Sequence, residues 1–259
     1  MALLSIEDLS ISFGGIRALQ GVSLEVNQGE IFAVIGPNGE GKTTILNCIS
    51  RLYEPDHGRI TLAGKDILKC KAHQLASLGI ARTFQNVELF TNMTVIENIL
   101  LGRHIYHTAG LLSQAIFYGK TRDEEVRQRR EAEEVIDFLD LQVHRTKRVG
   151  SLPYGVQKLV ELGRALATHP KLLLMDEVSS GMNLEETQDL MIWIKDIREH
   201  LGVTLILIEH DMRLVMEVSD RIGVIDCGRK IAEGIPQEIQ ANHDVIKAYL
   251  GAGDAVAHN

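Results

Sequence analysis

One short stretch, at residues 36–44, combines glycines, a lysine and two threonines in an order suited to phosphate chemistry. It reads GPNGEGKTT, which matches the pattern G-x-x-x-x-G-K-[ST] at every fixed position. Glycines let the backbone curl so that successive N–H groups point at one spot, and a following helix adds the positive end of its dipole there. That spot suits a polyphosphate. The residues expected to surround it are Gly36, Pro37, Asn38, Gly39, Gly41, Lys42, Thr43 and Thr44.

Two side chains of this stretch add chemistry that the backbone lacks. Lys42 places a compact cation on the terminal phosphates of a nucleotide, and the Thr43 hydroxyl ligates the magnesium ion that accompanies them. A mostly apolar run at residues 30–35 predicts a strand before the stretch, and residues 44–49 predict an opening helix after it. A glycine-rich turn that binds nothing is the alternative, and the full match between a strand and a helix argues against it.

Two acidic residues, Asp176 and Glu177, directly follow the apolar run KLLLM at residues 171–175. A continuous apolar run indicates a strand covered on both faces, and the carboxyl ends of parallel strands form the edge where such sheets bind ligands. We expect Asp176 to hold magnesium through water and Glu177 to polarise the water that attacks the γ-phosphate. An acid pair after a strand is a modest signal alone, and the phosphate-binding stretch strengthens it.

Gln85 and His210 occupy the same kind of position. Gln85 follows a predicted strand at residues 80–84, and His210 follows a buried strand predicted at 203–208. A neutral amide at a strand end is able to touch both the metal and the attacking water, and an imidazole there is able to reach the γ-phosphate. For Gln85 alone a surface amide is the plain alternative, and its position favours the functional interpretation.

The elements that must position these groups begin with an antiparallel pattern. Residues 4–13 and 22–26 carry strand-like alternation on either side of a Gly14-Gly15 turn, and we expect them to be edge strands that lead into the strand at 30–35. Phe13 ends the first of these strands. Its ring is placed either to lie against an adenine or to pack in the ordinary core.

From residue 86 to about residue 150 the pattern is helical and no strand is evident. Residues 95–101 predict an apolar helix and residues 122–141 a charged one. The apolar tract at 105–118 is too short to span a bilayer, so local packing is its default explanation and a partner contact the sharper one. The tail at residues 236–250 predicts one short helix. The fold class predicted is α/β: a P-loop NTPase core with a mainly parallel sheet, an N-terminal antiparallel β subdomain and an inserted α-helical subdomain.

Composition and charge exclude several classes of protein. The chain has 259 residues, of which 45% are hydrophobic, enough for a packed core. A net charge of −8 gives no sign of nucleic-acid binding, and we expect none. Cys48, Cys70 and Cys227 are widely spaced, which is typical of reduced thiols in a cytosolic protein. No stretch reaches the roughly 20 apolar residues of a membrane span, so we expect a chain that is not secreted and does not cross a membrane alone.

One more segment decides the family. Residues 151–157, SLPYGVQ, open a predicted helix shortly before the acid pair and resemble the signature sequence of the ATP-binding cassette (ABC) ATPases. The other motifs occur in that family's order. Residues 36–44 resemble its phosphate loop, Gln85 its glutamine loop and Asp176-Glu177 its acid pair. Ser180 to Asn183 resemble its dimer loop, and His210 resembles its switch histidine. The resemblance covers about residues 3–251. It implies a single ABC ATPase domain, in which 1–85 and 165–259 form the nucleotide-binding core with its β subdomain and 86–164 form the helical subdomain.

The resemblance also implies ligands and partners. The family binds two ATP molecules between the phosphate loop of one subunit and the signature helix of the other. The residues that would face the partner subunit are Leu152, Pro153, Tyr154, Gly155, Val156 and Gln157. ATP and Mg²⁺ are the implied ligands. The residues implied to hold the metal are Thr43, Gln85 and Asp176, and those implied to act in hydrolysis are Lys42, Gln85, Glu177 and His210. The nucleotide would be bound by the loop residues named above together with Phe13, Gln85 and His210. A homodimer and a heterodimer with a homologous ATPase both remain open. Membrane permease subunits are expected as partners, which would place the chain in the cytoplasm, peripheral on the inner face of the cell membrane.

Within the family, three segments resemble the ATPases of branched-chain amino-acid uptake importers. They are FGGIRAL at residues 13–19, the insertion between about 103 and 130, and the tail 242–251 that ends in Tyr-Leu-Gly. Relatives that serve urea or short amides, and the lipopolysaccharide-export ATPase, share parts of these features. The insertion favours the amino-acid group over the export one.

Three departures from the family pattern keep a second hypothesis open. Pro153 and Tyr154 stand where the family usually has serine and glycine, Glu40 stands at a position that is usually small, and Val178 replaces a common proline. A carboxylate near the phosphates would repel them by about a kcal/mol. The second hypothesis is a catalytically weak nucleotide-binding subunit that regulates an active partner, and the retention of the lysine, acids and histidine argues against it. A soluble ATPase of DNA repair or translation is disfavoured, because no long coiled coil, tandem cassette or basic patch is evident.

Overall fold

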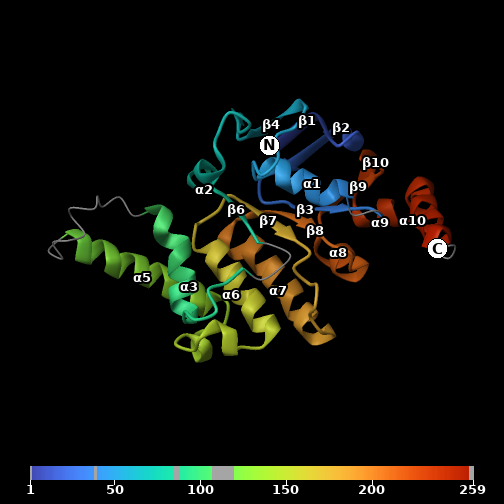
Figure 1. The fold of residues 1–259 in the computed structure, drawn as a ribbon. Helices are drawn as coiled ribbons and strands as arrows, with labels where there is room; N and C mark the ends of the chain where they lie inside the picture. The colour runs from blue at the N-terminus through green and yellow to red at the C-terminus, as the bar shows by residue number, and fades with distance from the viewer. Residues whose placement is uncertain (1, 38–39, 84–87, 107–119, 257–259) are drawn as a thin grey trace.

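A six-stranded sheet forms the centre of the molecule (Figure 1). The computed structural model describes residues 2–37, 40–83, 88–106 and 120–256. The strand order is β10-β9-β3-β8-β7-β6, in which β10 is antiparallel to β9 and the other neighbours are parallel. The strands are β3 (Ile31–Ile35), β6 (Ile80–Arg82), β7 (Leu172–Asp176), β8 (Thr204–Ile208), β9 (Arg221–Asp226) and β10 (Arg229–Gly234). The mainly parallel sheet predicted from the sequence is therefore confirmed.

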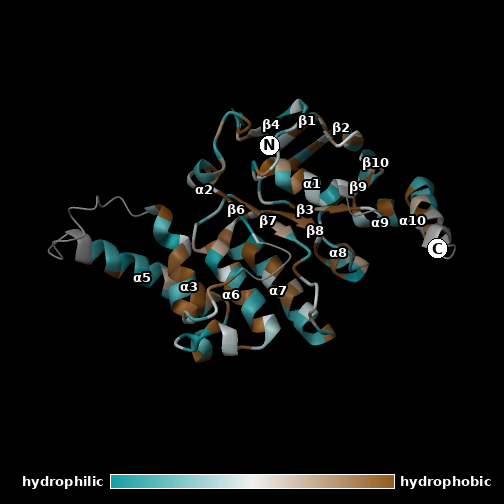
Figure 2. Ribbon diagram, viewed as in Figure 1, coloured by the Kyte–Doolittle hydropathy of each residue, from teal (hydrophilic) through white to brown (hydrophobic). Residues whose placement is uncertain are grey.

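The central strands are buried on both faces, as their continuous apolar runs predict. Every residue of β3, β7 and β8 is buried. Because side chains alternate along a strand, Phe32 and Val34 enter one hydrophobic cluster while Ala33 and Ile35 enter another on the opposite face. Figure 2 shows these strands as the hydrophobic centre of the fold. The parallel register brings the carboxyl ends of β3, β7 and β8 to one edge.

A second, antiparallel sheet covers one face of the central sheet together with the first helix. It has the order β2-β1-β4-β5 and contains β1 (Ala2–Phe13), β2 (Ile16–Asn27), β4 (His57–Leu62) and β5 (Lys65–Asp66). Its buried side chains join those of α1 (Glu40–Ile49) in the cluster that contains Phe32. The antiparallel pattern predicted for the opening segment is confirmed. These strands pair with β4 in a sheet of their own, which is the separate antiparallel β subdomain that the predicted fold class contains.

Helices cover the opposite face of the central sheet and extend beyond it. They are α3 (Val95–Gly102), α5 (Lys120–Phe138), α6 (Tyr154–Leu166), α7 (Leu184–Leu201) and α8 (Met212–Val218). Three of these, α3, α5 and α6, pack on one another and project to one side (Figure 1). The short elements are α2 (Leu75–Leu78) and 3-10 helices at Ala72–Gln74, Arg103–Tyr106, Gln142–His144 and Val149–Ser151. Between residues 88 and 150, the described parts contain helices, turns and an isolated bridge from Thr94 to Arg148, in agreement with the helical pattern.

The C-terminal segment differs from its prediction. The sequence predicted one helix over residues 236–250, whereas the structure has α9 (Pro236–Gln240) and α10 (His243–Val256). The break occurs because the Asn242 side chain accepts hydrogen bonds from the backbone N–H groups of Asp244 and Val245 and so starts a new helix. None of the described helices has the length and apolar content needed to cross a bilayer. The apolar tract at 105–118 lies almost wholly outside the described residues.

Candidate functional site

The loop between β3 and α1 begins with a glycine that the packing requires. A β-carbon on Gly36 would lie 1.8 Å from the Ile225 carbonyl oxygen of β9, so any other residue would force the two segments apart. A β-carbon on Gly41 would lie 3.3 Å from the Ala18 carbonyl oxygen. Pro37 is half-buried between these positions. Asn38 and Gly39 lie outside the described residues, as does the side chain of Glu40, the first residue of α1.

Lys42 is held inside this loop. Its side chain is almost fully buried, and its Nζ donates a hydrogen bond of 2.7 Å to the Gly36 carbonyl oxygen. Burial lowers the pKa of Lys42, and the negative charge of Glu177 opposes that shift. Thr44 is buried next to it and Thr43 is half-buried. A buried ammonium group whose bond is to a backbone carbonyl is well prepared to exchange that partner for a phosphate oxygen.

A cavity of about 530 Å³ opens beside the start of α1. Its lining combines aromatic, aliphatic and hydroxyl side chains, from Phe13, Ile16, Ala18, Thr43, Thr44, Asn47 and Tyr53. Phe13 is 43% exposed, so it does not belong to the packed core that was one of its two interpretations. Its ring meets Tyr53 edge to face, with centroids 5.0 Å apart. Sequence reasoning missed Tyr53, because an aromatic in the loop after α1 has no periodicity to mark it.

Asp176 lies at the end of β7, and its two carboxylate oxygens differ in their hydrogen bonding. Its Oδ2 accepts a hydrogen bond of 2.7 Å from Arg82 Nη2, and both side chains are buried. Its Oδ1 is also buried but has no hydrogen-bond partner among the residues that the structure describes. Burial raises the pKa of Asp176, and the bond to Arg82 counteracts that rise. A buried carboxylate oxygen without a partner is what a magnesium ion or its bound water would satisfy, so the residues present fit a magnesium ion.

Arg82 is a site residue that sequence reasoning missed. It ends β6, and its Nη1 donates at 2.7 Å to Oδ1 of Asn47, in the last turn of α1, and at 3.2 Å to Oγ of Ser50, directly after α1. Arg82 therefore links the central sheet, α1 and Asp176. An arginine inside a predicted strand was the available signal, because a buried guanidinium requires a carboxylate or several acceptors.

Glu177 and His210 lie together at the edge of the sheet. His210 Nε2 and Glu177 Oε1 are 2.8 Å apart, within hydrogen-bond distance. Glu177 has a φ of +48°, a left-handed conformation that costs energy for a residue with a side chain and is typical of functional sites. Its N–H donates to the Ile208 carbonyl oxygen of β8, which fixes that conformation. Glu177 is thus aimed by its backbone and held by the imidazole.

The loop that follows the acid pair is tied to β8 by another residue absent from the predictions. Glu209 is buried, and its carboxylate accepts hydrogen bonds from the Ser179 N–H at 2.9 Å and the Ser179 hydroxyl at 2.7 Å. Burial raises the pKa of Glu209, and these bonds oppose the rise. The loop ends where Asn183 caps α7 in a reciprocal pair with Glu186. Val178, one of the departures from the family pattern, is buried.

The segment at 152–157 forms the start of α6 and packs against the residues after the acid pair. Pro153 and Tyr154 are exposed, Val156 and Gln157 are half-buried, and Leu152 and Gly155 are buried. A β-carbon on Gly155 would lie 2.3 Å from Glu186 Oε1, and one on Gly181 would lie 2.9 Å from the Tyr154 ring. Gln157 Nε2 donates to the Leu152 carbonyl oxygen.

The start of α6 and the phosphate-binding loop belong to different parts of the molecule. Helix α6 packs on α3, α5 and β6, whereas α1 packs on β2, β7 and β9. The α6 cap residue, Pro153, provides no side-chain hydrogen bond to the first turn. The structure thus brings Lys42, Asp176, Glu177 and His210 to one region and leaves the 152–157 segment apart from it. Gln85 lies outside the described residues.

Comparisons with known proteins support the chemistry that this geometry suggests. A family model described as "ABC transporter" matches residues 19–180, and a model described as "Branched-chain amino acid ATP-binding cassette transporter" matches residues 229–255. The chain is 41% identical over 249 residues to a Salmonella typhimurium protein named "High-affinity branched-chain amino acid transport ATP-binding protein LivG", with 96% of this chain and 98% of that one covered.

Two further relatives extend this likeness. A Pseudomonas aeruginosa protein named "High-affinity branched-chain amino acid transport ATP-binding protein BraF" is 40% identical over 249 residues, with coverage of 96% and 98%. Among solved structures, the ADP conformation of MJ1267, described as an ATP-binding cassette of an ABC transporter, superposes with a TM-score of 0.84 at 34% identity and covers 97% of this chain and 99% of its own.

Proposed function

The chain belongs to the family of ABC transporter ATP-binding proteins, and from this membership we propose that it hydrolyses ATP to power an importer of branched-chain or other hydrophobic amino acids. Nucleotide binding follows from the family. The choice of amino acids rests on the names of the relatives and on the family match at residues 229–255. The observation that supports hydrolysis most directly is the contact between Glu177 and His210 at the sheet edge, near the buried Lys42.

In the proposed mechanism, the loop and its lysine hold the nucleotide. Backbone N–H groups of the loop after Pro37 and of the start of α1 surround the phosphates, and Lys42 exchanges the Gly36 carbonyl for a phosphate oxygen. The adenine lies in the cavity beside α1, against Phe13 and Tyr53. We propose that Mg²⁺ is held by Thr43, Gln85 and the Oδ1 oxygen of Asp176. When bound, the ion would neutralise the charge of the phosphates.

Glu177 and His210 then act on the attacking water and the γ-phosphate. Glu177 accepts a hydrogen bond from the water and increases its nucleophilicity, while its left-handed backbone keeps the carboxylate in place. His210, which is 54% exposed in its side chain, exchanges its bond to Glu177 for a γ-phosphate oxygen when nucleotide is present. Gln85 is proposed to orient the same water.

A head-to-tail dimer completes the proposed site. The start of α6 carries uncapped backbone N–H groups and an exposed Tyr154, and it packs away from its own phosphate loop. A second copy or a homologous subunit would bring that helix end to the phosphates and add backbone donors there. We propose that permease subunits at the inner face of the cell membrane convert the closing of this dimer into transport. Because α6 packs away from the phosphate loop, we also propose that residues 86–164 form a helical subdomain and that 1–85 and 165–259 form the nucleotide-binding core.

A catalytically weak, regulatory subunit is the second candidate. Pro153 at the helix start and Glu40 in the loop favour it, because both depart from the family pattern. The arrangement of Lys42, Glu177 and His210 opposes it, since a site released from catalysis has no reason to keep a strained glutamate paired with a histidine.

The test is steady-state Mg-ATPase activity of the purified chain beside Glu177→Gln, with size-exclusion profiles in ATP. We expect slow hydrolysis by the unmodified chain and an inactive variant that accumulates as an ATP-bound dimer. Glu134→Gln is the matched control, because Glu134 is an exposed carboxylate on α5 that pairs with Arg130. If neither chain hydrolyses ATP, even with a partner cassette and permease added, the active-ATPase proposal fails and the regulatory subunit replaces it.

A further inference from the structure

Three consecutive residues, the last of β8 and the two that follow it, each hold a different group of the segment that begins with Glu177. The Ile208 carbonyl oxygen accepts a hydrogen bond from the Glu177 N–H at 2.8 Å. The Glu209 carboxylate accepts two from Ser179, at Oε1 from the N–H at 2.9 Å and at Oε2 from the hydroxyl at 2.7 Å. His210 Nε2 lies 2.8 Å from Glu177 Oε1. The two segments are therefore attached to each other at three points.

Glu209 is a charged side chain in a buried position. It is 2% exposed and directly follows β8, in which every residue is buried. Burial of a carboxylate costs free energy unless hydrogen bonds compensate for the lost water. The two donors of Ser179 provide this compensation, and each uses a different carboxylate oxygen. A carboxylate suits this partner because both of its oxygens accept, whereas a glutamine amide has one acceptor oxygen.

The turn that starts at Glu177 needs such support because its backbone is strained. A φ of +48° is left-handed, and a residue with a side chain keeps that conformation only when its surroundings over-determine it. The Ile208 bond fixes the backbone at Glu177 itself, and the Glu209 bonds fix it two residues later. Between them, the Ser180 N–H donates to the Glu177 carbonyl oxygen at 3.1 Å. The turn is therefore held at both of its ends.

One of the three attachments does not persist through the proposed reaction. In that mechanism His210 exchanges its bond to Glu177 for a γ-phosphate oxygen, so the imidazole does not hold the carboxylate while the water attacks. The bonds from Ser179 to Glu209 involve no group that the proposed nucleotide contacts or the water use. At that step the direction of the Glu177 side chain depends on the backbone of the turn, which Glu209 helps to hold.

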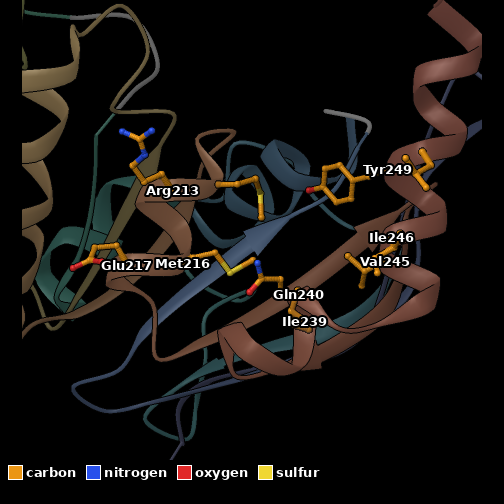
Figure 3. A pocket seen from close by; sticks show the side chains of 10 residues that line it. Arg213, Met216, Glu217, Ile239, Gln240, Val245, Ile246 and Tyr249 are labelled. Carbon is orange, nitrogen blue, oxygen red and sulfur yellow. The ribbon is translucent and has the colours of Figure 1, made fainter.

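The residues that hold the turn are themselves well supported. Strand β8 pairs with β3 on one side and β7 on the other. Asp211 then caps α8 by accepting hydrogen bonds from two N–H groups of its first turn. Helix α8 packs on α7, whereas a cavity of about 650 Å³, with Met212 and Met216 in its lining, lies between α8 and α10 (Figure 3). Support for residues 208–210 thus comes from the sheet and from the α7 side of α8.

We propose that Glu209 is a positioning residue for hydrolysis: its carboxylate holds Ser179 and thereby keeps the turn in the conformation that directs Glu177 at the attacking water. The inference rests on the proposed function and goes beyond it by assigning a role to a buried residue outside the proposed nucleotide and water contacts. Loss of this role should slow the chemical step and leave nucleotide affinity intact, because Ser179 and Glu209 are not among the residues proposed to hold the nucleotide.

The test compares full-length Glu209→Gln with the unmodified chain in steady-state Mg-ATPase activity and in equilibrium binding of MgADP. The substitution keeps the shape of the side chain and removes one of its two acceptor oxygens. One hydrogen bond to a charged group corresponds to about 10- to 150-fold in an equilibrium constant. We expect kcat to fall about tenfold and the dissociation constant of MgADP to stay within about twofold of the unmodified value. A kcat within about twofold of the unmodified one, or an equal loss of MgADP affinity, overturns the inference.

Glu30→Gln is the matched control. Glu30 is also a buried carboxylate beside a central strand, 7% exposed and paired with Arg221 at 2.9 Å. It precedes β3 and so lies at the opposite edge of the sheet from Glu209. Its substitution should lower the melting temperature without lowering kcat. Equal losses of kcat in the two variants would indicate general destabilisation and refute the positioning role.

Two variants of Ser179 keep the inference testable if Glu209→Gln folds poorly. Ser179→Ala removes the hydroxyl donor and should lower kcat, whereas Ser179→Thr keeps both donors and should hydrolyse ATP as the unmodified chain does. Because Ser179→Ala and Glu209→Gln disrupt the same contact, their combined effect on kcat should be smaller than the product of the separate effects. An unmodified kcat in Ser179→Ala, or a combined effect equal to the product, counts against the inference.

Amide hydrogen exchange distinguishes failure of this inference from failure of the proposed function. In the nucleotide-free protein, exchange across residues 177–182 should become faster in Glu209→Gln and stay unchanged in Glu30→Gln. Equal exchange in Glu209→Gln and the unmodified chain refutes the inference alone, even when the chain is an active ATPase. An unmodified chain that is no more active than Glu177→Gln, with a partner cassette and permease present, refutes the proposed function and the inference with it.

Discussion

Replacing Arg82 by methionine should expose how strongly the buried acid depends on its partner. In the structure, Asp176 and Arg82 side chains are 3% and 9% exposed, and Arg82 also bonds Asn47 and Ser50. Removing one member of a buried ion pair leaves the other charge uncompensated, which costs about 3–5 kcal/mol. For a chain of this size that corresponds to a fall in the melting temperature on the order of 10 °C.

The loss of stability caused by Arg82→Met should depend on pH, and the raised pKa of Asp176 determines the direction of that dependence. Burial already raises the pKa of Asp176 above its unfolded value, and loss of Arg82 removes the main influence that opposes the rise. Below the unfolded pKa both states are protonated and the buried carboxyl carries no charge penalty. As pH rises past the unfolded pKa toward the higher folded pKa, the unfolded state releases its proton more readily and stability is lost. The destabilisation should therefore be larger at pH 8 than near pH 5.

The assay is thermal and urea unfolding of the nucleotide-free protein, followed by fluorescence of the single tryptophan, Trp193. Arg198→Met is the matched control, because Arg198 and Asp220 form an ion pair in which both side chains are 37% exposed. That pair should contribute about 1 kcal/mol or less. If Arg82→Met destabilises no more than Arg198→Met, or if its cost is larger at low pH, the account of Asp176 as a buried carboxylate held by Arg82 is wrong.

Two further predictions concern the proposed nucleotide site. Phe13→Ala should weaken MgATP binding about 5- to 150-fold, since base stacking on an aromatic ring contributes about 1–3 kcal/mol, while binding of magnesium tripolyphosphate stays unchanged. Equal losses for both ligands in calorimetric titrations would contradict a role at the base. His210→Ala should lower kcat for ATP by about a hundredfold or more with dimer formation in ATP retained, because no imidazole is then present to bond the γ-phosphate. A variant that hydrolyses ATP at the unmodified rate removes His210 from the mechanism.

Most of the proposed catalytic residues lie in short segments, and the sequence by itself was enough to predict them. The stretch at residues 36–44 has its function in its own backbone, so composition and spacing suffice to predict it. The apolar runs that became β3, β7 and β8 are buried on both faces, which is why Asp176 ends one strand and His210 follows another at the same edge of the sheet. The fold class followed from the same runs together with the alternation at the chain's start.

Tertiary structure alone decided which distant groups meet. Arg82 and Asp176 are 94 residues apart, and their contact depends on β6 lying beside β7 in the sheet. The bonds that Ser179 donates to Glu209 likewise join segments whose neighbourhood depends on strand order. Periodicity reports which face of an element is buried but carries no record of what covers it. The sequence therefore predicted the groups that do the chemistry, while the side chains that hold those groups in place became visible only in the folded chain.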